Sequence, residues 1–240
     1  MIRALPIISL VCVAQLSTGC NIGVSAKRAA SPGGAVINRC RTTHVPGDGL
    51  FDDFEDGDRQ AAKVGKRGGY WWTKKDEVGS TIEFMADEPG AGGSELAMHV
   101  TGTTARGSAE AAWGAGLGVN FSPQNGELYD ASKYAGISFR AKVGSPRSAR
   151  AVRLKIADVN THQDAKICKT CWNHFGKDLT LTPEWKEYRV SFSGAEQEPG
   201  WGDPRPQAVT PSKLVGLNWG VGPGNDYDIW IDDVAFLDCE

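Results

Sequence analysis

The sequence predicts an all-β protein, an antiparallel β-sandwich. Three observations predict this class: several short stretches alternate apolar and polar residues, turn clusters separate them, and no long segment has helical periodicity. The 30 glycines and 12 prolines supply many such turns. The spacing leaves no room for the crossover helices that a parallel sheet needs. We therefore expect two packed antiparallel sheets.

Alternation locates the strands. At 136–143, Ile137 and Phe139 face one side while Ser138 and Arg140 face the other, as in a half-buried strand. Similar runs follow one another at 81–86, 95–100, 113–121, 136–143, 152–159, 187–192, 214–221 and 227–237. The turns "DEPGAGGS", "VGSPRS" and "EPGWGDPRP" lie between them. No segment repeats at a fixed spacing, which argues against solenoids and propellers.

The strand expected at 113–121, "WGAGLGVNF", places glycines on one face. Gly114, Gly116 and Gly118 alternate with Ala115, Leu117 and Val119. A row of bare backbone either lets another segment pack closely or leaves a smooth floor for a ligand. The sequence leaves both interpretations open.

The N-terminus, "MIRALPIISLVCVAQLSTGC", predicts a secretory signal at 1–19, too short to be a spanning helix. "LSTGC" resembles a bacterial lipobox, so we expect a lipid on Cys20, although Leu16 lies one position farther from it than usual. Asn21 gives no reason for retention in the inner membrane, which favours the outer membrane of the cell envelope. The stretch 20–49 is expected to be a linker, and 50–240 the domain.

The motif "CKTC" at 168–171 has three interpretations: part of a zinc site, a redox pair, or a local disulfide. Zinc needs about four ligands, and His162 and His174 do not match the spacing of a zinc finger. A redox pair needs the start of a helix, whereas loop-like residues surround this motif. Export to an oxidising compartment favours a disulfide between Cys168 and Cys171.

A series of motifs then carries a resemblance. It comprises "LFDDFEDGD", "GYWWTKKDEVGSTI", "GAGLGVNF", "YDASKYAGISFRAKV", "VRLKIADVNT", "CKTCWNHFGKDLTLTPEWKEYRVSF" and "DIWIDDVAFL". In this order they resemble jelly-roll carbohydrate-binding domains near the family 11 modules, and the complex I intermediate-associated family of the same galactose-binding-like fold. The resemblance covers Leu50 to Leu237 and implies polysaccharide binding, often with structural calcium. Here the domain follows a lipobox and no catalytic module is visible, which departs from the usual targeting of a fused glycanase.

The jelly roll implies further pairings at the chain ends. Because the termini of such a fold tend to lie side by side, we expect Cys40 to pair with Cys239. Calcium prefers oxygen ligands, and Asp53 and Glu55 near one end could meet Asp232 and Asp233 near the other. Alternation lets only one of Asp232 and Asp233 point inward.

A sugar groove combines aromatic platforms with side chains that hydrogen-bond hydroxyl groups. The candidates are Tyr70, Trp72, Trp113, Asp158, Asn173, His174 and Asn218. For Trp113 and Trp219 core packing is an open alternative, and for Asn173 and His174 the alternative is a hydrogen-bonded loop corner. The predicted ligand is a polysaccharide, of a β-glucan-like kind, bound by a monomer.

Other functions find less support. The net charge of −3, with both signs interspersed, gives no footprint for nucleic acid. The serine-nucleophile elbow, the phosphate loop and the HExxH motif are absent. The sequence thus indicates a non-catalytic role, while a polysaccharide lyase or glycoside hydrolase stays open. The other alternative is a structural or interaction lipoprotein of the envelope.

Overall fold

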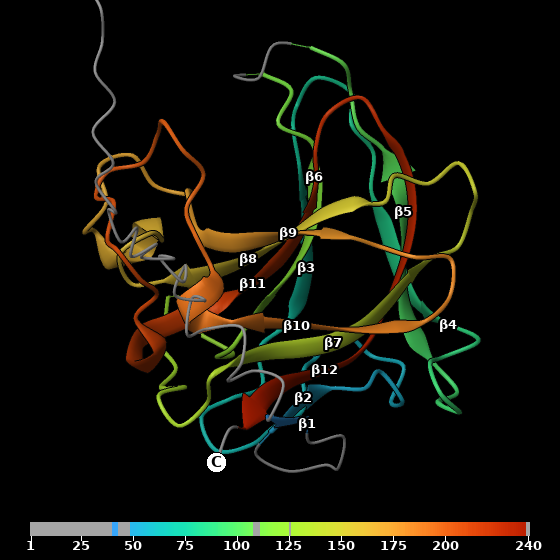
Figure 1. The fold of residues 1–240 in the computed structure, drawn as a ribbon, viewed down its shortest axis with the longest axis horizontal. Helices are drawn as coiled ribbons and strands as arrows, with labels where there is room; N and C mark the ends of the chain where they lie inside the picture. Colours follow the sequence, from blue (N-terminus) through green and yellow to red (C-terminus); the bar gives the residue numbers. More distant parts are fainter. Residues whose placement is uncertain (1–39, 43–48, 108–110, 125, 239–240) are drawn as a thin grey trace, which may run out of the picture. The chain divides into compact units, whose positions relative to one another are not determined.

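A computed structural model of the chain describes residues 40–42, 49–107, 111–124 and 126–238. These residues form two antiparallel sheets packed as a sandwich (Figure 1), which confirms the expected fold class. In one sheet the strand order is β10–β7–β12–β5–β4, and β1 and β2 also pair with β12. In the other the order is β3–β6–β11–β8–β9.

The strands of the first sheet are β1 (Arg41–Thr42), β2 (Leu50–Asp52), β4 (Glu83–Asp87), β5 (Ala97–Thr103), β7 (Gly136–Val143), β10 (Lys186–Ser191) and β12 (Asp226–Asp238). Those of the second are β3 (Trp71–Lys75), β6 (Ala115–Asn120), β8 (Ala151–Asp158), β9 (Phe175–Thr180) and β11 (Leu214–Val221). Three 3-10 turns, η1 (Gln163–Ala165), η2 (Phe192–Gly194) and η3 (Pro211–Lys213), lie between strands. The expected runs all contain strands, whereas β1, β2, β3 and β9 lie outside them.

Aromatic residues from both sheets fill the space between the layers. Phe236 of β12 is fully buried, stacks on Tyr134 at 4.5 Å between ring centroids and lies 5.4 Å from Phe121. Trp219 of β11 is buried against Phe139 of β7, with ring centroids 5.3 Å apart. Trp219 therefore belongs to the core, the alternative that the sequence left open, and is not a platform on the surface.

The two ends of the described chain meet at β12. β1 pairs Arg41 with Asp238, and β2 pairs Leu50 with Ala235, so the first strands lie beside the last one (Figure 1). β1 thus joins the sheet from within the segment expected to be a linker. Cys40, just before β1, is buried and disulfide-bonded. Cys239 lies outside the described residues, so its pairing with Cys40 stays a prediction.

The described part of the chain contains no helix of sufficient length and hydrophobicity to span a membrane. The expected signal at 1–19 and the expected lipidation site Cys20 lie outside it.

Candidate functional site

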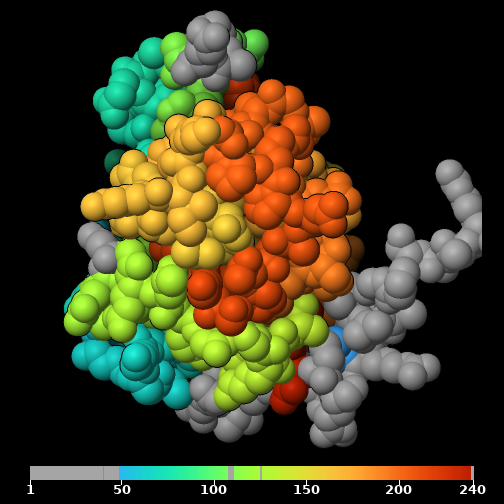
Figure 2. Space-filling view, turned by 90° about the vertical axis from the view of Figure 1, so that its left-hand side faces the viewer, coloured from blue at the N-terminus to red at the C-terminus, as the bar shows by residue number. Residues whose placement is uncertain are grey.

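A groove of about 630 Å³ lies on the outer face of the five-stranded sheet. β3, β6, β8 and β11 form its floor, and the loops before β6, before β9 and after β10 form its walls. The chain segments around 160–175 and 195–210 lie side by side on one face of the molecule (Figure 2), and Thr170 and Asp203 form a bridge between them.

The pleat and register of the sheet place the floor residues. Trp72 of β3 pairs with Gly118 of β6, Gly118 with Asn218 of β11, Asn218 with Lys155 of β8, and Lys155 with Gly176 of β9. Paired residues point to the same side of a sheet. One row across all five strands therefore carries, in order, an aromatic ring, a glycine, an amide, an ammonium group and a second glycine.

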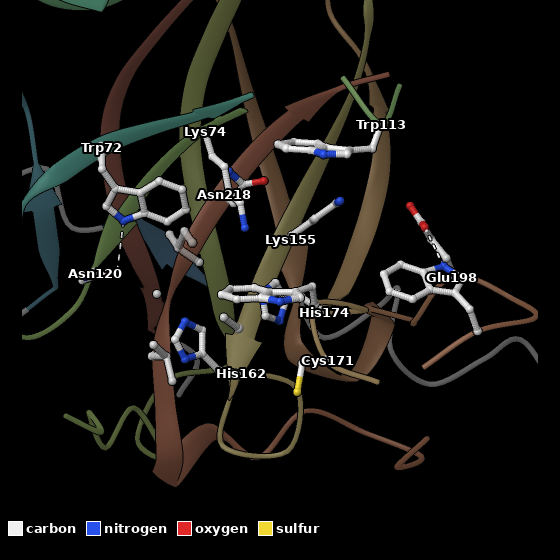
Figure 3. Close-up of a pocket in the computed structure, with 16 residues that line it drawn as sticks. Trp72, Lys74, Trp113, Asn120, Lys155, His162, Cys171, His174, Glu198 and Asn218 are labelled. Carbon is white, nitrogen blue, oxygen red and sulfur yellow. Dashed lines mark hydrogen bonds between the residues drawn. The ribbon is translucent and has the colours of Figure 1, made fainter. Parts of the chain in front are cut away.

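The glycines of β6 let groove side chains lie directly on the strand. A Cβ at Gly118 would lie 2.3 Å from the indole of Trp72, and one at Gly116 would lie 2.6 Å from the amide of Asn218. Trp72 also donates from Nε1 to Oδ1 of Asn120 at 3.0 Å, which fixes the ring in its position (Figure 3). The glycine face thus serves both purposes, since it packs side chains closely and those side chains face the groove.

Trp113 stands at the rim, just before β6. Its side chain is 43% exposed, which is unusual for a large aromatic residue in the described chain. The turn that carries it is fixed by Asp76, whose Oδ2 accepts the Gly114 N–H at 3.0 Å and whose N–H donates to the Gly114 carbonyl at 2.9 Å. An exposed ring on a fixed turn can act as a platform.

The loop before β9 supplies another wall. The disulfide between Cys168 and Cys171 is present, as predicted. The next residue, Trp172, has a left-handed backbone with φ of 76°, and its N–H donates to the Thr161 carbonyl at 2.9 Å. Its ring lies edge-on to His162, with centroids 5.0 Å apart, and lines the groove. A non-glycine residue in this region is held there by its surroundings, here the bridged loop.

His174 follows at the bottom of the groove and takes part in a polar chain. The carboxylate of Asp158 accepts the hydroxyl of Thr161 at 3.0 Å, together with the N–H groups of Asn160 and Thr210. Because Thr161 donates its proton to Asp158, its oxygen accepts from Nδ1 of His174 at 2.9 Å. This network assigns the proton to Nδ1. Nε2 is then an acceptor, and no residue that the structure describes hydrogen-bonds it.

Both imidazoles of the groove favour the neutral form. Burial, with smaller contributions from His162, Lys155 and Lys74, lowers the pKa of His174 to about 3. Burial and the charge of Lys74 lower the pKa of His162, against the opposing effect of Asp164. Nδ1 of His162 accepts the N–H of Asp164 at 3.4 Å, which leaves Nε2–H as a donor. One imidazole thus offers an acceptor and the other a donor.

Asn173 joins two walls of the groove without facing into it. It is buried, and its amide donates to the carbonyls of Glu198 and Trp201 at 2.9 and 2.7 Å. Its Oδ1 accepts the N–H of Glu198 at 2.9 Å. These three hydrogen bonds of Asn173 hold Glu198 and Trp201 at the rim of the groove. There Trp201, which is 38% exposed, donates from Nε1 to Glu198 at 3.0 Å.

Two lysines project from the floor. Lys155 reaches from β8 toward the space below Trp113, as Figure 3 shows. Lys74 of β3 lies with Nζ 4.0 Å from the ring centroid of Trp172 and 5.9 Å from that of Trp113. Burial lowers the pKa of Lys155, against the opposing effect of Glu198.

The structure brings four of the seven predicted ligand-binding residues into the groove: Trp72, Trp113, His174 and Asn218. Tyr70 is exposed but does not line it, and Asp158 and Asn173 are buried behind it as supports for His174 and Glu198. Their assignment as groove residues is therefore corrected. Sequence reasoning missed Lys74, Asn120, Lys155, His162, Trp172, Glu198 and Trp201.

The predicted calcium ligands do not all meet. Glu55 accepts the Ser94 hydroxyl at 2.5 Å, and Asp232 accepts the N–H of Ala91 at 2.7 Å, so both approach the loop 91–96. Asp233 instead pairs with Arg140 at 3.3 Å, and Asp53 only accepts the N–H of Glu55.

Burial raises the pKa of Asp232 to about 7, the situation in which a bound cation would stabilise the ionised form. Within the described residues, no three acidic, histidine or cysteine side chains are arranged to hold a metal. Any calcium at this loop would therefore use Glu55 and Asp232 together with oxygen atoms from other groups. Calcium binding stays a prediction, and the predicted protein carboxylates are now Glu55 and Asp232 alone.

Comparison with solved structures identifies similar folds. The family 11 carbohydrate-binding module of a cellulosomal cellulase of Clostridium thermocellum is 18% identical, with 81% of this chain and 96% of that chain covered and a TM-score of 0.56. The same family's module from that organism, in complex with a β-1,3-1,4-mixed-linked tetrasaccharide, gives 18% identity, coverage of 80% and 98%, and a TM-score of 0.54. A family 30 module gives 11% identity, coverage of 80% and 87%, and a TM-score of 0.50.

The likeness shows the fold. The jelly roll of carbohydrate-binding modules, expected from the resemblance, is thereby confirmed. No family model matches the sequence, and neither does any curated protein.

The neutral His174 predicts a loss of stability in acid. Below the ordinary pKa of 6.5 the imidazole of His174 is protonated in the unfolded chain, whereas in the folded chain it stays neutral until about pH 3. The contribution of His174 is therefore complete above pH 6.5 and falls as the pH drops toward 3, by about 2 kcal/mol at pH 5. In His174→Asn the asparagine amide can still donate to Thr161 but does not titrate. Between about pH 7.5 and 5, the free energy of unfolding of this variant should therefore fall by about 2 kcal/mol less than that of the wild type. Denaturant unfolding at both values measures this, and equal losses in both proteins would contradict it.

Removal of calcium tests the loop 91–96. A chelator should lower the melting temperature of the wild-type chain, because the cation would bind the folded state alone. Glu55→Gln and Asp232→Asn should show no such response, whereas the exposed Asp56→Asn should keep it. If neither a chelator nor added calcium changes the melting temperature of the wild type, a calcium site at this loop is excluded.

Proposed function

We propose that the protein binds polysaccharide, without catalysis, in the groove on the five-stranded sheet. One observation carries the proposal: four tryptophans, Trp72, Trp113, Trp172 and Trp201, surround a groove of about 630 Å³. Sugar rings present flat C–H faces that pack on indole rings, and their hydroxyls need both donors and acceptors. The groove supplies these from Asn218, His162 and His174.

The shape of the groove favours an extended chain. Its floor spans β3, β6, β11 and β8, and Gly216 leaves bare backbone between Asn120 and Ala157, so a ligand can lie close to the sheet there. The family 11 module of the same fold was solved with a mixed-linked β-glucan tetrasaccharide. By this analogy of fold, a β-linked polysaccharide such as a β-glucan belongs among the first ligands to test.

Affinity electrophoresis tests the proposal. The full chain, with Cys20→Ala to prevent lipidation, should be retarded in gels that contain a polysaccharide it binds, among β-glucan, xylan, mannan and pectin. Trp72→Ala should weaken binding about tenfold, since a platform contributes about 1 kcal/mol beyond burial and further contact area is lost. His174→Ala should also weaken it. The matched control is Trp185→Ala, a residue that lies just before β10 of the other sheet and contacts Lys142.

Folding of each variant is checked by its melting temperature. Lack of retardation in every gel would reject the carbohydrate function and favour the envelope-structural alternative. Retardation that persists in both groove variants and is lost in Trp185→Ala would move the binding face to the other sheet.

We also propose that the chain is exported and anchored by lipid on Cys20. Two or three acyl chains, at about 0.8 kcal/mol per buried methylene, would make the attachment effectively permanent. A palmitate analogue fed to expressing cells should label the wild type and Cys12→Ala but not Cys20→Ala. Equal labelling of Cys20→Ala and wild type would reject the anchor.

A further inference from the structure

We infer that the groove selects polysaccharides that carry anionic groups, either uronate carboxylates or sulfate esters, and that Lys155 and Lys74 recognise the charge. The inference rests on the proposed function and names the substrate class of the same site. It distinguishes the ligand from a neutral β-glucan.

Lys155 occupies the centre of the floor. It stands in the row between Asn218 and Gly176, and its stem runs past Gly220, where a Cβ would lie 3.7 Å from its Cε. Its side chain is half-buried, and burial lowers its pKa. Across the part of the chain that the structure describes, no carboxylate lies within 4.0 Å of its ammonium group. A partly buried cation without a counter-ion is costly, and an anion on the ligand would offset that cost.

Lys74 lies on the same face of the sheet, in the neighbouring row. Its ammonium group is 4.0 Å from the ring centroid of Trp172. Contact with an aromatic face holds a cation in place but leaves its charge uncompensated. Like Lys155, it has no carboxylate partner among the described residues. Two fixed ammonium groups therefore face one groove.

Glu198 is the acidic residue of the groove lining, and other groups already hold it. Its Oε2 accepts Trp201 Nε1 at 3.0 Å, and its Oε1 lies 3.6 Å from Nε of Arg153. With both imidazoles neutral, the charged side chains that line the groove are two lysines against one glutamate. The groove is thus cationic on a chain whose net charge is −3.

A neutral sugar and an anionic sugar would affect these lysines differently. A neutral chain that covers the floor removes water from both ammonium groups and returns hydrogen bonds to hydroxyl oxygens, but no opposite charge. A carboxylate or sulfate returns hydrogen bonds and an opposite charge as well, and the attraction between the two charges is stronger where water is excluded. The anionic chain should therefore bind more tightly although the tryptophan contacts are the same.

The test compares each polymer with its neutralised form, so that the backbone stays constant. The ligands are pectate beside fully methyl-esterified pectin, alginate beside its ester, and carrageenan beside desulfated carrageenan, with β-glucan as a neutral reference. The full chain, as Cys20→Ala, should bind at least one charged form about tenfold more tightly than its neutral partner, and this preference should shrink as salt rises from about 0.05 to 0.5 M.

Substitutions of the two lysines test whether the groove floor causes the preference for charged polymers. Lys155→Met and Lys74→Met should lose most of the preference for the charged form, whereas Lys155→Arg, which keeps the charge, should retain it. The matched control is Lys75→Met, an exposed neighbour on β3 that does not line the groove. Melting temperatures confirm that each variant folds.

The outcomes are distinct. Preference for both carboxylated and sulfated forms assigns recognition to charge alone, while preference for one kind assigns it to that group; either result supports the inference. Equal binding of charged and neutral forms, or binding of β-glucan alone, overturns the inference and leaves the proposed function intact. If Lys155→Met loses affinity equally for the charged and the neutral form of a polymer, the inference is also overturned. Binding to none of the polymers rejects the proposed function itself.

Discussion

Trp72 can lie flat on the sheet because Gly118, its neighbour across the strand pair, has no side chain. A Cβ at Gly118 would occupy the place of the indole and force the ring outward. The same constraint applies at Gly116, over which the amide of Asn218 lies. The bare positions of β6 therefore keep the floor low, since a side chain at either one would displace the indole or the amide outward into the groove.

The walls depend on buried polar groups in place of apolar packing. The amide of Asn173 holds the segment 198–201 through three hydrogen bonds, and Asp158 holds His174 through Thr161. The disulfide before Trp172 restricts the loop that contributes its ring. Groups fixed before the ligand arrives lose little conformational entropy on binding, which favours affinity from a small number of contacts.

Alternation predicted most strands correctly because they have one dry and one wet face. β7 is typical, with Phe139 buried and Arg140 turned outward. The rule missed β3, where both Trp71 and Trp72 are aromatic although only Trp71 enters the core. It also missed β9, which begins with a buried phenylalanine and a glycine. In β3 the outward position is Trp72, whose ring lines the groove, so the polar half of the alternating pattern is absent there.

The residue types of the site could be predicted from the sequence more readily than the directions of their side chains. Trp72, Trp113, His174 and Asn218 lie in the groove, as expected from residue types that combine an aromatic face or a hydrogen-bonding group with a place on a strand or loop. Asn173 has equally suitable chemistry but points beneath the loop, and periodicity gives no direction for a residue in a loop. The reverse holds for Trp172, whose ring reaches the groove through a left-handed backbone that no sequence signal predicts for tryptophan.

In the proposed function, the lysines of the groove would recognise charge and its imidazoles would recognise hydroxyl groups. The positive charges of Lys74 and Lys155 add to burial in keeping His174 neutral, so its Nε2 stays an acceptor. Protonation of the imidazole would replace that acceptor with a second donor beside two cations, which the fixed Asp158–Thr161 pair does not compensate. Under the proposed function, the lysines would have two consequences on the same floor: they would attract an anionic group of the ligand, and they would preserve the acceptor for a neighbouring sugar hydroxyl.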